Sequence, residues 1–453
     1  MITSPAFSGK RYAVLGLARS GLAAAEALLA SGAEVTAWDR QDVARARLKG
    51  RAKLADPLDL DLTGFDGVVV SPGVPLNTHP IAGHAAKFGV PVIGDIELFA
   101  QARANLPPHK VVGITGTNGK STTTALVHHI LQAAGVPTLM GGNIGIPIME
   151  QDPLPEGGVY VLELSSYQID LTLSLDCDVA VLLNVTPDHL DRYESFEAYA
   201  ASKARLFGMQ DAAHAAIIAG DDNVTREIAA LEWLRRPQHP TWWLVHADQV
   251  GDQSGLPSLQ GPHNAQNVVA ARAVGQALGV ADDALALALK TFVGLPHRME
   301  FVAEHKGVTF INDSKATNTD STAPALAAYP PVGGRPRIHW IVGGLPKEDG
   351  LGATEAHLGN IAAAYTIGEA GPRFAELLEG RVPVTRAELL CEATRAALEA
   401  AQPGDVVLLS PACASFDQFK DYERRGEHFR QIVAMLTGEG QPTAPRLEGK
   451  SAA

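Results

Sequence analysis

The chain has 453 residues, of which 46% are hydrophobic and 19% are charged, and its formal net charge is -13. At roughly 150 residues per domain, this length predicts about three domains with separate cores. The acidic balance and the lack of any basic run exclude a protein that grips nucleic-acid backbones, so we expect no nucleic-acid partner. Any anionic substrate must then be bound by a few local cations.

Cysteine usage and apolar patterning indicate a cytoplasmic protein. Cys177, Cys391 and Cys413 are an odd number at wide spacings, which fits neither a disulfide framework nor a zinc pattern. The N-terminal residues 1–21 lack the apolar segment of a signal peptide, and no apolar stretch approaches the roughly 18 residues of a membrane span. We therefore expect no membrane partner, and we expect the protein to be a monomer.

Short apolar runs alternate with alanine-rich helical stretches along nearly the whole chain, which is typical of parallel α/β units. Three blocks can be separated, and we predict domains at 1–106, 107–298 and 299–437, followed by a disordered tail at 438–453. The runs expected to form strands are 11–15, 33–38, 67–70, 110–115, 159–164, 179–184, 308–312, 337–344, 362–367 and 405–409. The stretches most clearly expected to form helices are 121–135, 196–207 and 261–279.

Residues 113–124, GITGTNGKSTTT, contain a glycine-rich loop that ends in Lys-Ser. In such a loop the glycines let successive N–H groups point at phosphate oxygens, the lysine adds a point charge, and the following hydroxyl binds Mg²⁺. Gly116, Gly119, Lys120 and Ser121 fill these positions. Ile114 stands where the strict pattern has its first glycine, so the loop is a variant, and an ordinary strand-to-helix turn is the alternative.

Three further residues are candidates for the same site. Glu163 ends an apolar run, where the acidic ligand of a nucleotide-bound metal usually lies, although a solvated carboxylate at a strand end is the alternative. His189 follows the run 179–184 and should emerge at the same sheet edge, although a lone histidine is more often structural. By spacing alone, Lys203 is a surface lysine of its helix.

The start of the chain resembles a dinucleotide-binding fingerprint with one glycine missing. The pattern G-x-G-x-x-G is occupied by Gly16, Ala18 and Gly21, and the acid expected about 20 residues later is Asp39. Because Ala18 replaces the glycine that lets the backbone approach a pyrophosphate, a nicotinamide dinucleotide is less favoured than a mononucleotide-type ligand. A plain α/β turn is the other alternative.

Taken together, eight motifs closely resemble those of the Mur ligases. They are GTNGKST (116–122), GGNIGIP (141–147), ELSSYQ (163–168), NVTPDHLDRY (184–193), GPHNAQN (261–267), GLPHRMEF (294–301), NDSKATN (312–318) and SPACASFDQF (410–419). Each motif is only moderately specific, but all of them in this order are highly specific. The resemblance covers nearly the whole chain except the tail.

The resemblance implies three domains: a Rossmann-like N-terminal domain, a central P-loop-type ATPase domain with a mainly parallel sheet, and a Rossmann-like C-terminal domain. It implies an ATP-dependent amide ligase of peptidoglycan precursor synthesis, and the motifs at 312–318 and 410–419 favour a member that joins D-glutamate to UDP-N-acetylmuramoyl-L-alanine through an acyl phosphate. The cofactors implied are ATP and two Mg²⁺ ions. Ser121 and Glu163 would hold one ion. His189 would help to hold the second, together with Lys203 in carbamylated form, because a carbamate turns a cation into an anionic oxygen ligand.

The remaining site residues follow from the same resemblance, and Lys120, Glu163, His189 and Lys203 would be the catalytic ones. The residues expected to bind ATP are Gly116, Thr117, Asn118, Gly119, Lys120, Ser121, Thr122, Asn264, Asn267, Arg298 and Asp313. The residues expected to bind the UDP-linked substrate or D-glutamate are Arg19, Ser20, Asp39, Gly73, Asn143, Lys315, Thr317, Lys347 and Ser415. Lys347 also suits a dicarboxylic amino acid on charge grounds alone.

Three positions depart from the family pattern. Ala18 stands where a second glycine is usual, which leaves the uridine contacts of its neighbours open. Pro346 precedes Lys347 where an acid or a glycine is common, so the local backbone can differ. Tyr422 carries a hydroxyl at an aromatic position, and we leave it out of the predicted site.

Four rival functions remain. A folylpolyglutamate synthetase would usually carry an additional glycine after the loop lysine, and another Mur ligase would fit the motifs at 312–318 and 410–419 less well. A P-loop ATPase that serves as a binding switch would leave the lysines of the third block unexplained. A nicotinamide-dependent dehydrogenase would rest on residues 11–40 alone.

Overall fold

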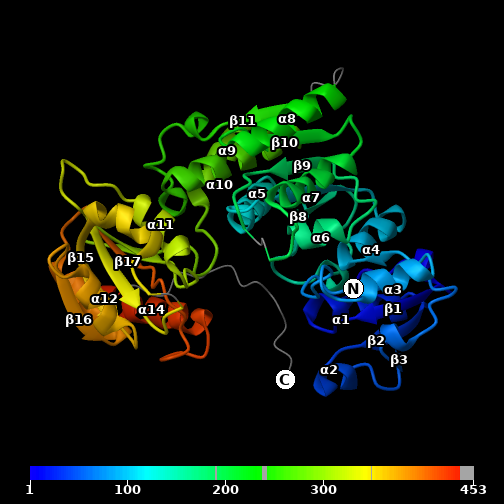
Figure 1. The fold of residues 1–453 in the computed structure, drawn as a ribbon. Helices are drawn as coiled ribbons and strands as arrows, with labels where there is room; N and C mark the ends of the chain where they lie inside the picture. The colour runs from blue at the N-terminus through cyan, green and yellow to red at the C-terminus, as the bar shows by residue number, and fades with distance from the viewer. Residues whose placement is uncertain (189–190, 237–241, 348, 439–453) are drawn as a thin grey trace. The chain divides into compact units, whose positions relative to one another are not determined.

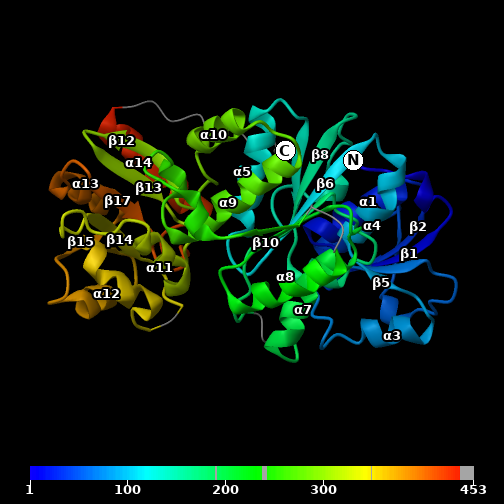
Figure 2. The same ribbon diagram turned by 90° about the horizontal axis from the view of Figure 1, so that it is seen from above.

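The computed structural model describes residues 1–188, 191–236, 242–347 and 349–438. These residues divide into two compact units, the first formed by Met1–Gln249 with Gln266–Ala288 and the second by Val250–Ala265 with Leu289–Ala453. The first unit holds two β-sheets and the second holds one, each flanked by helices (Figures 1 and 2). The predicted α/β class is therefore confirmed. Residues 439–453 of the predicted tail lie outside the described part of the chain.

The first sheet is built from the N-terminal residues. Its strands are β1 (Arg11–Leu15), β2 (Glu34–Trp38), β3 (Lys53–Leu54), β4 (Gly67–Val70) and β5 (Val92–Ile93), and its helices are α1 (Arg19–Ala30), α2 (Asp42–Ala46), α3 (Ile81–Lys87) and α4 (Asp95–Ala102). The strand order is β3-β2-β1-β4-β5, and every pair is parallel. The order reverses between β1 and β4, and ligands of such sheets bind at the carboxyl ends of the strands beside this reversal.

The second sheet has a strand at its centre that leads into the phosphate loop. Its strands are β6 (His109–Thr115), β7 (Thr138–Gly142), β8 (Gly158–Glu163), β9 (Val179–Leu182), β10 (Ala215–Ala219) and β11 (Trp242–Val245). Its helices are α5 (Lys120–Ala133), α6 (Ser166–Asp170), α7 (Phe196–Gly208), α8 (Asn223–Arg235), α9 (Pro262–Ala277) and α10 (Asp282–Thr291), of which α9 and the end of α10 extend across the division between the units. The order is β11-β10-β9-β6-β8-β7, with parallel pairs throughout.

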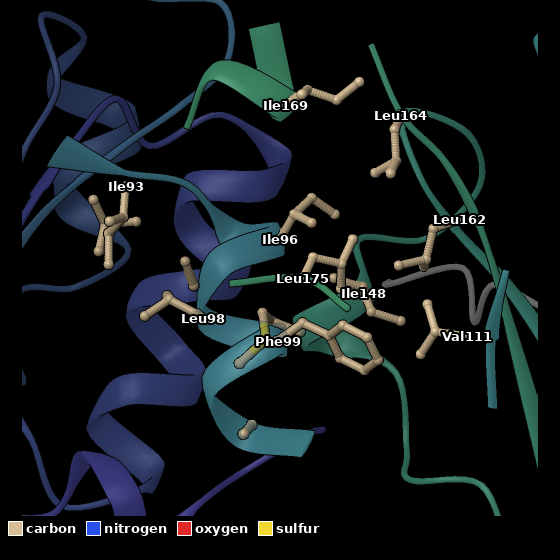
Figure 3. Close-up of a cluster of buried hydrophobic side chains, with 14 of the residues drawn as sticks. Ile93, Ile96, Leu98, Phe99, Val111, Ile148, Leu162, Leu164, Ile169 and Leu175 are labelled. Carbon is tan, nitrogen blue, oxygen red and sulfur yellow. The ribbon is translucent and has the colours of Figure 1, made fainter. Parts of the chain in front are cut away.

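One buried hydrophobic cluster joins the first two sheets. Figure 3 shows Ile96 and Phe99 of α4 among side chains of the second sheet, including Val111 and Leu162. Hydrogen bonds reinforce this packing, because the Glu97 carboxylate accepts from the backbone N–H of residues 173 and 174 at 2.7 and 2.9 Å. The first two sheets therefore share a core within one unit.

The third sheet lies in the second unit. Its strands are β12 (Glu300–His305), β13 (Val308–Asn312), β14 (Ile338–Gly343), β15 (Ile361–Ile367), β16 (Val384–Glu388) and β17 (Val406–Leu409), and its helices are α11 (Thr319–Ala327), α12 (Gly371–Leu378), α13 (Leu390–Ala400) and α14 (Tyr422–Thr437). The order is β12-β13-β17-β14-β15-β16, and only the hairpin of β12 and β13 is antiparallel. The carboxyl ends of β13, β17 and β14 are therefore neighbours at one edge.

Every apolar run that we expected to form a strand does so, and the three expected helices are α5, α7 and α9. Each sheet lies within one of the three predicted domain ranges, although the exact boundaries stay a prediction. Among the described residues, no helix combines the length and the apolar character needed to cross a membrane.

Candidate active site

The phosphate loop connects β6 to α5, and two of its glycines have backbone angles that other residues rarely adopt. Gly116 has φ +154° and Gly119 has φ +82°. A Cβ atom on Gly119 would lie 2.2 Å from Oδ1 of Asn267, so this loop also requires glycine for space. Asn267, which the sequence assigned to ATP binding, thus lies against the loop.

Hydrogen bonds from a neighbouring strand end hold the loop. Asn184, which follows β9, accepts from the N–H of Thr117 through its carbonyl and from the N–H of Asn118 through its side chain, both at 2.8 Å. The Lys120 ammonium donates to the carbonyls of Gly116 and Thr117 at 2.9 and 2.7 Å. Ser121 and Thr122 form the first turn of α5, whose exposed N–H groups and dipole favour anions.

Glu163 ends β8 beside this loop, and it is only 2% exposed. Its Oε1 accepts from Nδ2 of Asn143 at 2.9 Å, and the Asn143 N–H donates to the Glu163 carbonyl at 2.8 Å. Its Oε2 is buried and has no hydrogen-bond partner among the described residues. Since a buried carboxylate oxygen needs a donor or a cation, this atom fits a metal ligand.

Lys203 lies on α7 with only 1% of its surface exposed, so the expectation of a surface lysine from spacing alone is wrong. Its Nζ donates to the Gly116 carbonyl at 2.9 Å and lies 4.5 Å from the centre of the Tyr199 ring. Burial, followed by the charge of Lys120, lowers the pKa of Lys203 to about 7. The predicted partner His189 lies outside the described residues.

Asn264 and Asn267, one turn apart on α9, are both buried. Thr123 of α5 donates to Oδ1 of Asn267 at 3.1 Å, and Asn264 donates to the carbonyl of Gln260 at 3.0 Å. Their roles toward the ATP base and ribose stay predictions.

The first sheet shows why its fingerprint tolerates an alanine. Gly16 has φ +87°, and a Cβ on Gly21 would lie 1.8 Å from the Gly16 carbonyl oxygen, so both positions need glycine. Ala18 has φ -68°, which any residue can adopt. The Asp39 carboxylate accepts from the N–H of Leu17 at 2.6 Å, which ties the ends of β1 and β2 together.

The predicted substrate residues of the first block gather at the carboxyl edge of that sheet. Arg19 and Ser20 begin α1 after β1, Asp39 follows β2, and Gly73 follows β4 in an exposed loop. The Arg19 guanidinium donates to the carbonyl of Gly145, close in sequence to Asn143. The edge of the first sheet and the loop after β7 therefore meet within one unit.

Four predicted D-glutamate residues lie at the carboxyl edge of the third sheet. Lys315 and Thr317 follow β13, Lys347 follows β14, and Ser415 follows β17, and these three strands are neighbours. The Lys347 ammonium donates to the Thr317 hydroxyl at 2.8 Å. The sheet thus brings together residues that are about 100 positions apart in the sequence.

Asp313 and Arg298 lie near the same edge, but in different surroundings. Asp313 is buried, and its carboxylate accepts from the N–H of Met299 at 3.1 Å and from the Ser410 hydroxyl at 2.7 Å. Burial raises the pKa of Asp313 to about 7. Arg298 is partly exposed in a short turn that Leu295 closes.

Comparison with known proteins identifies the family. Residues 114–242 match the model of the Mur ligase middle domain, and residues 297–413 match that of the Mur ligase, glutamate ligase domain. A protein of Novosphingobium aromaticivorans named UDP-N-acetylmuramoylalanine--D-glutamate ligase is 64% identical over 447 residues, which cover 98% of this chain and 99% of that protein. The chain belongs to the Mur ligase family. A relative of the same name from Sphingopyxis alaskensis is 60% identical over 96% of this chain and 100% of its own length.

Solved Mur ligase structures share the fold. The UDP-N-acetylmuramate-alanine ligase of Thermotoga maritima has a TM-score of 0.56 at 17% identity, covering 94% of this chain and 99% of that chain. A second Mur ligase from the same organism, solved in complex with ADP, has a TM-score of 0.55 at 17% identity, covering 95% and 96%. The predicted family and the predicted class of enzyme, a ligase, are both confirmed.

Sequence reasoning missed three residues that support this Mur ligase site. Asn184 is the first residue of the motif at 184–193, and its position at the end of an apolar run could have identified it as a residue of the site. The Tyr199 hydroxyl lies 3.1 Å from that of Thr117, and nothing in the sequence signals this contact. Arg425 of α14 is 1% exposed and donates to the carbonyls of residues 314, 413 and 414 at 2.9, 3.0 and 3.2 Å, which joins the loops after β13 and β17.

Proposed function

We propose that the chain uses ATP to join D-glutamate to UDP-N-acetylmuramoyl-L-alanine, a step of peptidoglycan precursor synthesis, as a monomer in the cytoplasm. The identity of 64% to a relative named for this reaction supports the choice of substrates. The observation that carries the proposed chemistry is the buried, unpartnered Oε2 of Glu163 beside the phosphate loop. A site of this kind suits ATP with a metal ion.

The proposed reaction has two chemical steps. A carboxylate oxygen of the UDP-linked substrate attacks the γ-phosphorus of ATP, and ADP leaves with the electrons of the broken P–O bond. The amino nitrogen of D-glutamate then attacks the carbonyl carbon of the acyl phosphate, loses a proton, and expels phosphate together with that carboxylate oxygen. Lys120 and the N-terminus of α5 offset the negative charge that the phosphoryl group carries during the first step.

The donor set fits magnesium. We assign Ser121 and Glu163 to one Mg²⁺ ion, and His189 with the carbamylated Lys203 to a second. Among the described residues no three His, Cys, Asp or Glu side chains gather as a metal site, but Mg²⁺ commonly keeps water and phosphate oxygens as most of its ligands. When bound, these ions would neutralise charge on the transferring phosphoryl group.

Carbamylation of Lys203 agrees with the surroundings of its amine. Only the neutral amine attacks CO₂, forming an N–C bond and releasing a proton to water, and the lowered pKa of Lys203, about 7, keeps part of this amine neutral near pH 7. A carbamate would also replace the ammonium charge beside Lys120 with an anion, which would attract rather than repel Lys120.

The remaining roles are those that the resemblance to the Mur ligases implies. We assign Asn264, Asn267 and Asp313 to the base and ribose of ATP, and Arg298 to its phosphates. The residues assigned to the UDP-linked substrate are Arg19, Ser20, Asp39, Gly73 and Asn143. The residues assigned to D-glutamate are Lys315, Thr317, Lys347 and Ser415. The hydrogen bond from the Lys347 ammonium to the Thr317 hydroxyl supports this assignment, because it holds a cation among these residues and a dicarboxylic amino acid needs one.

Phosphate release tests the proposed function. We expect ATP hydrolysis to depend on UDP-N-acetylmuramoyl-L-alanine and to be selective for D-glutamate in a panel of D- and L-amino acids. Release that is indifferent to the amino acid would rule out the assignment. A folate substrate in place of the UDP-linked substrate distinguishes the folylpolyglutamate rival, and we expect it to support no phosphate release.

A further inference from the structure

Arg298 lies in a turn whose backbone is strained on both sides of it. His297 and Met299, on either side of it, have φ +61° and φ +45°, in the left-handed region that side-chain-bearing residues rarely adopt. Such strain persists only where the surroundings hold the backbone, and it is concentrated at functional sites. The strain at both flanking residues therefore indicates a functional role for this turn and for Arg298 within it.

Backbone hydrogen bonds fix the turn on both sides of Arg298. The N–H of His297 donates to Oε2 of Glu300 at 2.8 Å, and the carbonyl of His297 accepts from the N–H of Lys315 at 2.9 Å. The N–H of Met299 donates to Oδ1 of Asp313 at 3.1 Å. The turn is thus tied directly to the loop that carries the predicted D-glutamate lysine.

The imidazole of His297 is locked by side-chain contacts. Nδ2 of Asn312 lies 3.0 Å from its Nδ1. The amide of Asn312 is oriented by Oε2 of Glu300, 2.9 Å from Nδ2, and by the N–H of Ser314, 3.2 Å from Oδ1, while Nη2 of Arg430 lies 3.3 Å from the other ring nitrogen of His297, Nε2. Burial and the charge of Arg430 lower the pKa of His297 to about 4, so the ring is neutral at neutral pH and can accept.

Helix α14 packs directly against this ring. A Cβ atom on Gly426 would lie 2.1 Å from Nδ1 of His297, so only glycine leaves room for the imidazole. His297 and Met299 are 7% and 8% exposed, whereas Arg298 between them is partly exposed. The packing therefore buries both neighbours and leaves Arg298 as the partly exposed residue of the three.

We propose that His297 is a positioning residue, whose buried ring and left-handed backbone set the direction of Arg298 and so the affinity for the phosphates of ATP. This inference rests on the proposed role of Arg298. Because the Lys315 N–H is held by the His297 carbonyl, the same turn also fixes the spacing between the phosphate-binding arginine and the D-glutamate loop.

A double-mutant cycle on His297 and Arg298 tests the inference. The readouts are the Kd of a non-hydrolysable ATP analogue, adenylyl imidodiphosphate, and the KM for ATP, with thermal unfolding as a check on the fold. We expect His297→Ala and Arg298→Ala each to weaken the analogue about tenfold, the loss of one charge-assisted contact. Because His297 acts through Arg298, the double variant should be no weaker than Arg298→Ala alone.

Further variants separate positioning from stability. His297→Asn should recover part of the affinity lost in His297→Ala, since asparagine adopts left-handed backbone readily. Gly426→Ala should reproduce the weakening by displacing the His297 ring without changing any residue of the turn, and it decides the question if the His297 variants do not fold. Lys306→Ala is the matched control, since Lys306 also has φ +51° but belongs to the β12–β13 hairpin, and it should leave the Kd unchanged.

If the two substitutions weaken binding independently, so that their fold-changes in Kd multiply in the double variant, the inference is wrong. An unchanged Kd in a folded His297→Ala protein would also overturn it. If Arg298→Ala itself leaves the Kd unchanged, the role of Arg298 fails and the inference fails with it. If the wild type binds the analogue but releases no phosphate in response to D-glutamate, the proposed function fails while the cycle still decides the role of His297.

Discussion

The ammonium of Lys203 and the ammonium of Lys120 donate to the same carbonyl oxygen, that of Gly116, each at 2.9 Å. Two cations at one acceptor repel each other, and burial adds to the cost of charge on Lys203. Both effects favour a neutral amine at Lys203, and burial has the larger effect and Lys120 the smaller one. The loop to which we assign phosphate binding therefore also favours the neutral amine of Lys203, which we expect to react with CO₂.

Carbamylation of Lys203 predicts a specific ¹³C signal. Because the folded-state pKa of about 7 is depressed, the neutral amine fraction rises with pH, and so should a ¹³C carbamate resonance between about pH 6 and about pH 8 at constant dissolved ¹³CO₂. Lys203→Ala should lack that resonance and be nearly inactive, with partial recovery on adding a short-chain carboxylate. Full activity of Lys203→Ala would remove the carbamate from the mechanism.

Glu163→Gln should damage metal binding more than the fold. The variant keeps an oxygen for Asn143 but replaces the unpartnered Oε2 with an amide nitrogen that repels a cation. We expect kcat to fall at least about 100-fold, in line with the loss of charge stabilisation at the reacting centre, and the Mg²⁺ concentration for half-maximal activity to rise. A wild-type response to Mg²⁺ in this variant would contradict the assignment of Glu163.

Gly119→Ala and Gly135→Ala form a matched pair for the phosphate loop. Both glycines have positive φ, +82° and +74°, so each substitution should cost about 1 kcal/mol or more of backbone strain. Only the Cβ at 119 meets another group, Oδ1 of Asn267, whereas that at 135 has no atom within 4 Å. Calorimetric titration should therefore show loss of nucleotide binding in Gly119→Ala alone, and equal binding by the two variants would contradict this account.

Arg425→Met should loosen the D-glutamate site. The substitution removes three hydrogen bonds from the guanidinium to backbone carbonyls and one to the Ser314 hydroxyl, which should cost about 3 kcal/mol of unfolding free energy. It also frees the loops that carry Lys315 and Ser415, so the KM for D-glutamate should rise more than the KM for ATP. Arg424→Ala, at the exposed neighbouring position, is the control and should change neither.

Ten of the described strands were predicted, because parallel strands buried on both faces appear as continuous apolar runs, whereas β3, β5, β7, β10, β11, β12 and β16 were not predicted. The run 179–184 needed no structural information to be identified as a strand. Strand β16 was not anticipated, because it is an edge strand whose residues are mostly exposed and include Thr385 and Arg386. Its place in the sheet depends on pairing with β15, which the local sequence does not encode.

Site residues could be predicted where a reactive residue type directly follows an apolar run. They could not be predicted where their burial depends only on tertiary packing. The phosphate loop and Glu163 follow apolar runs directly, so their meeting at one sheet edge could be expected. The burial of Lys203 could not, because helical spacing does not reveal which face of α7 the sheet covers. Arg425 and the buried ring of His297 depend on contacts across more than 100 residues of sequence.

An isotope experiment tests the central claim, transfer of the γ-phosphoryl group to a substrate carboxylate. UDP-N-acetylmuramoyl-L-alanine labelled with ¹⁸O in its terminal carboxylate is incubated with the enzyme, ATP, Mg²⁺ and D-glutamate, and the released phosphate is analysed by mass spectrometry. An acyl phosphate requires one ¹⁸O atom in each phosphate released and one in the amide product. Phosphate that carries no ¹⁸O, with its new oxygen drawn from water, would contradict the proposed mechanism.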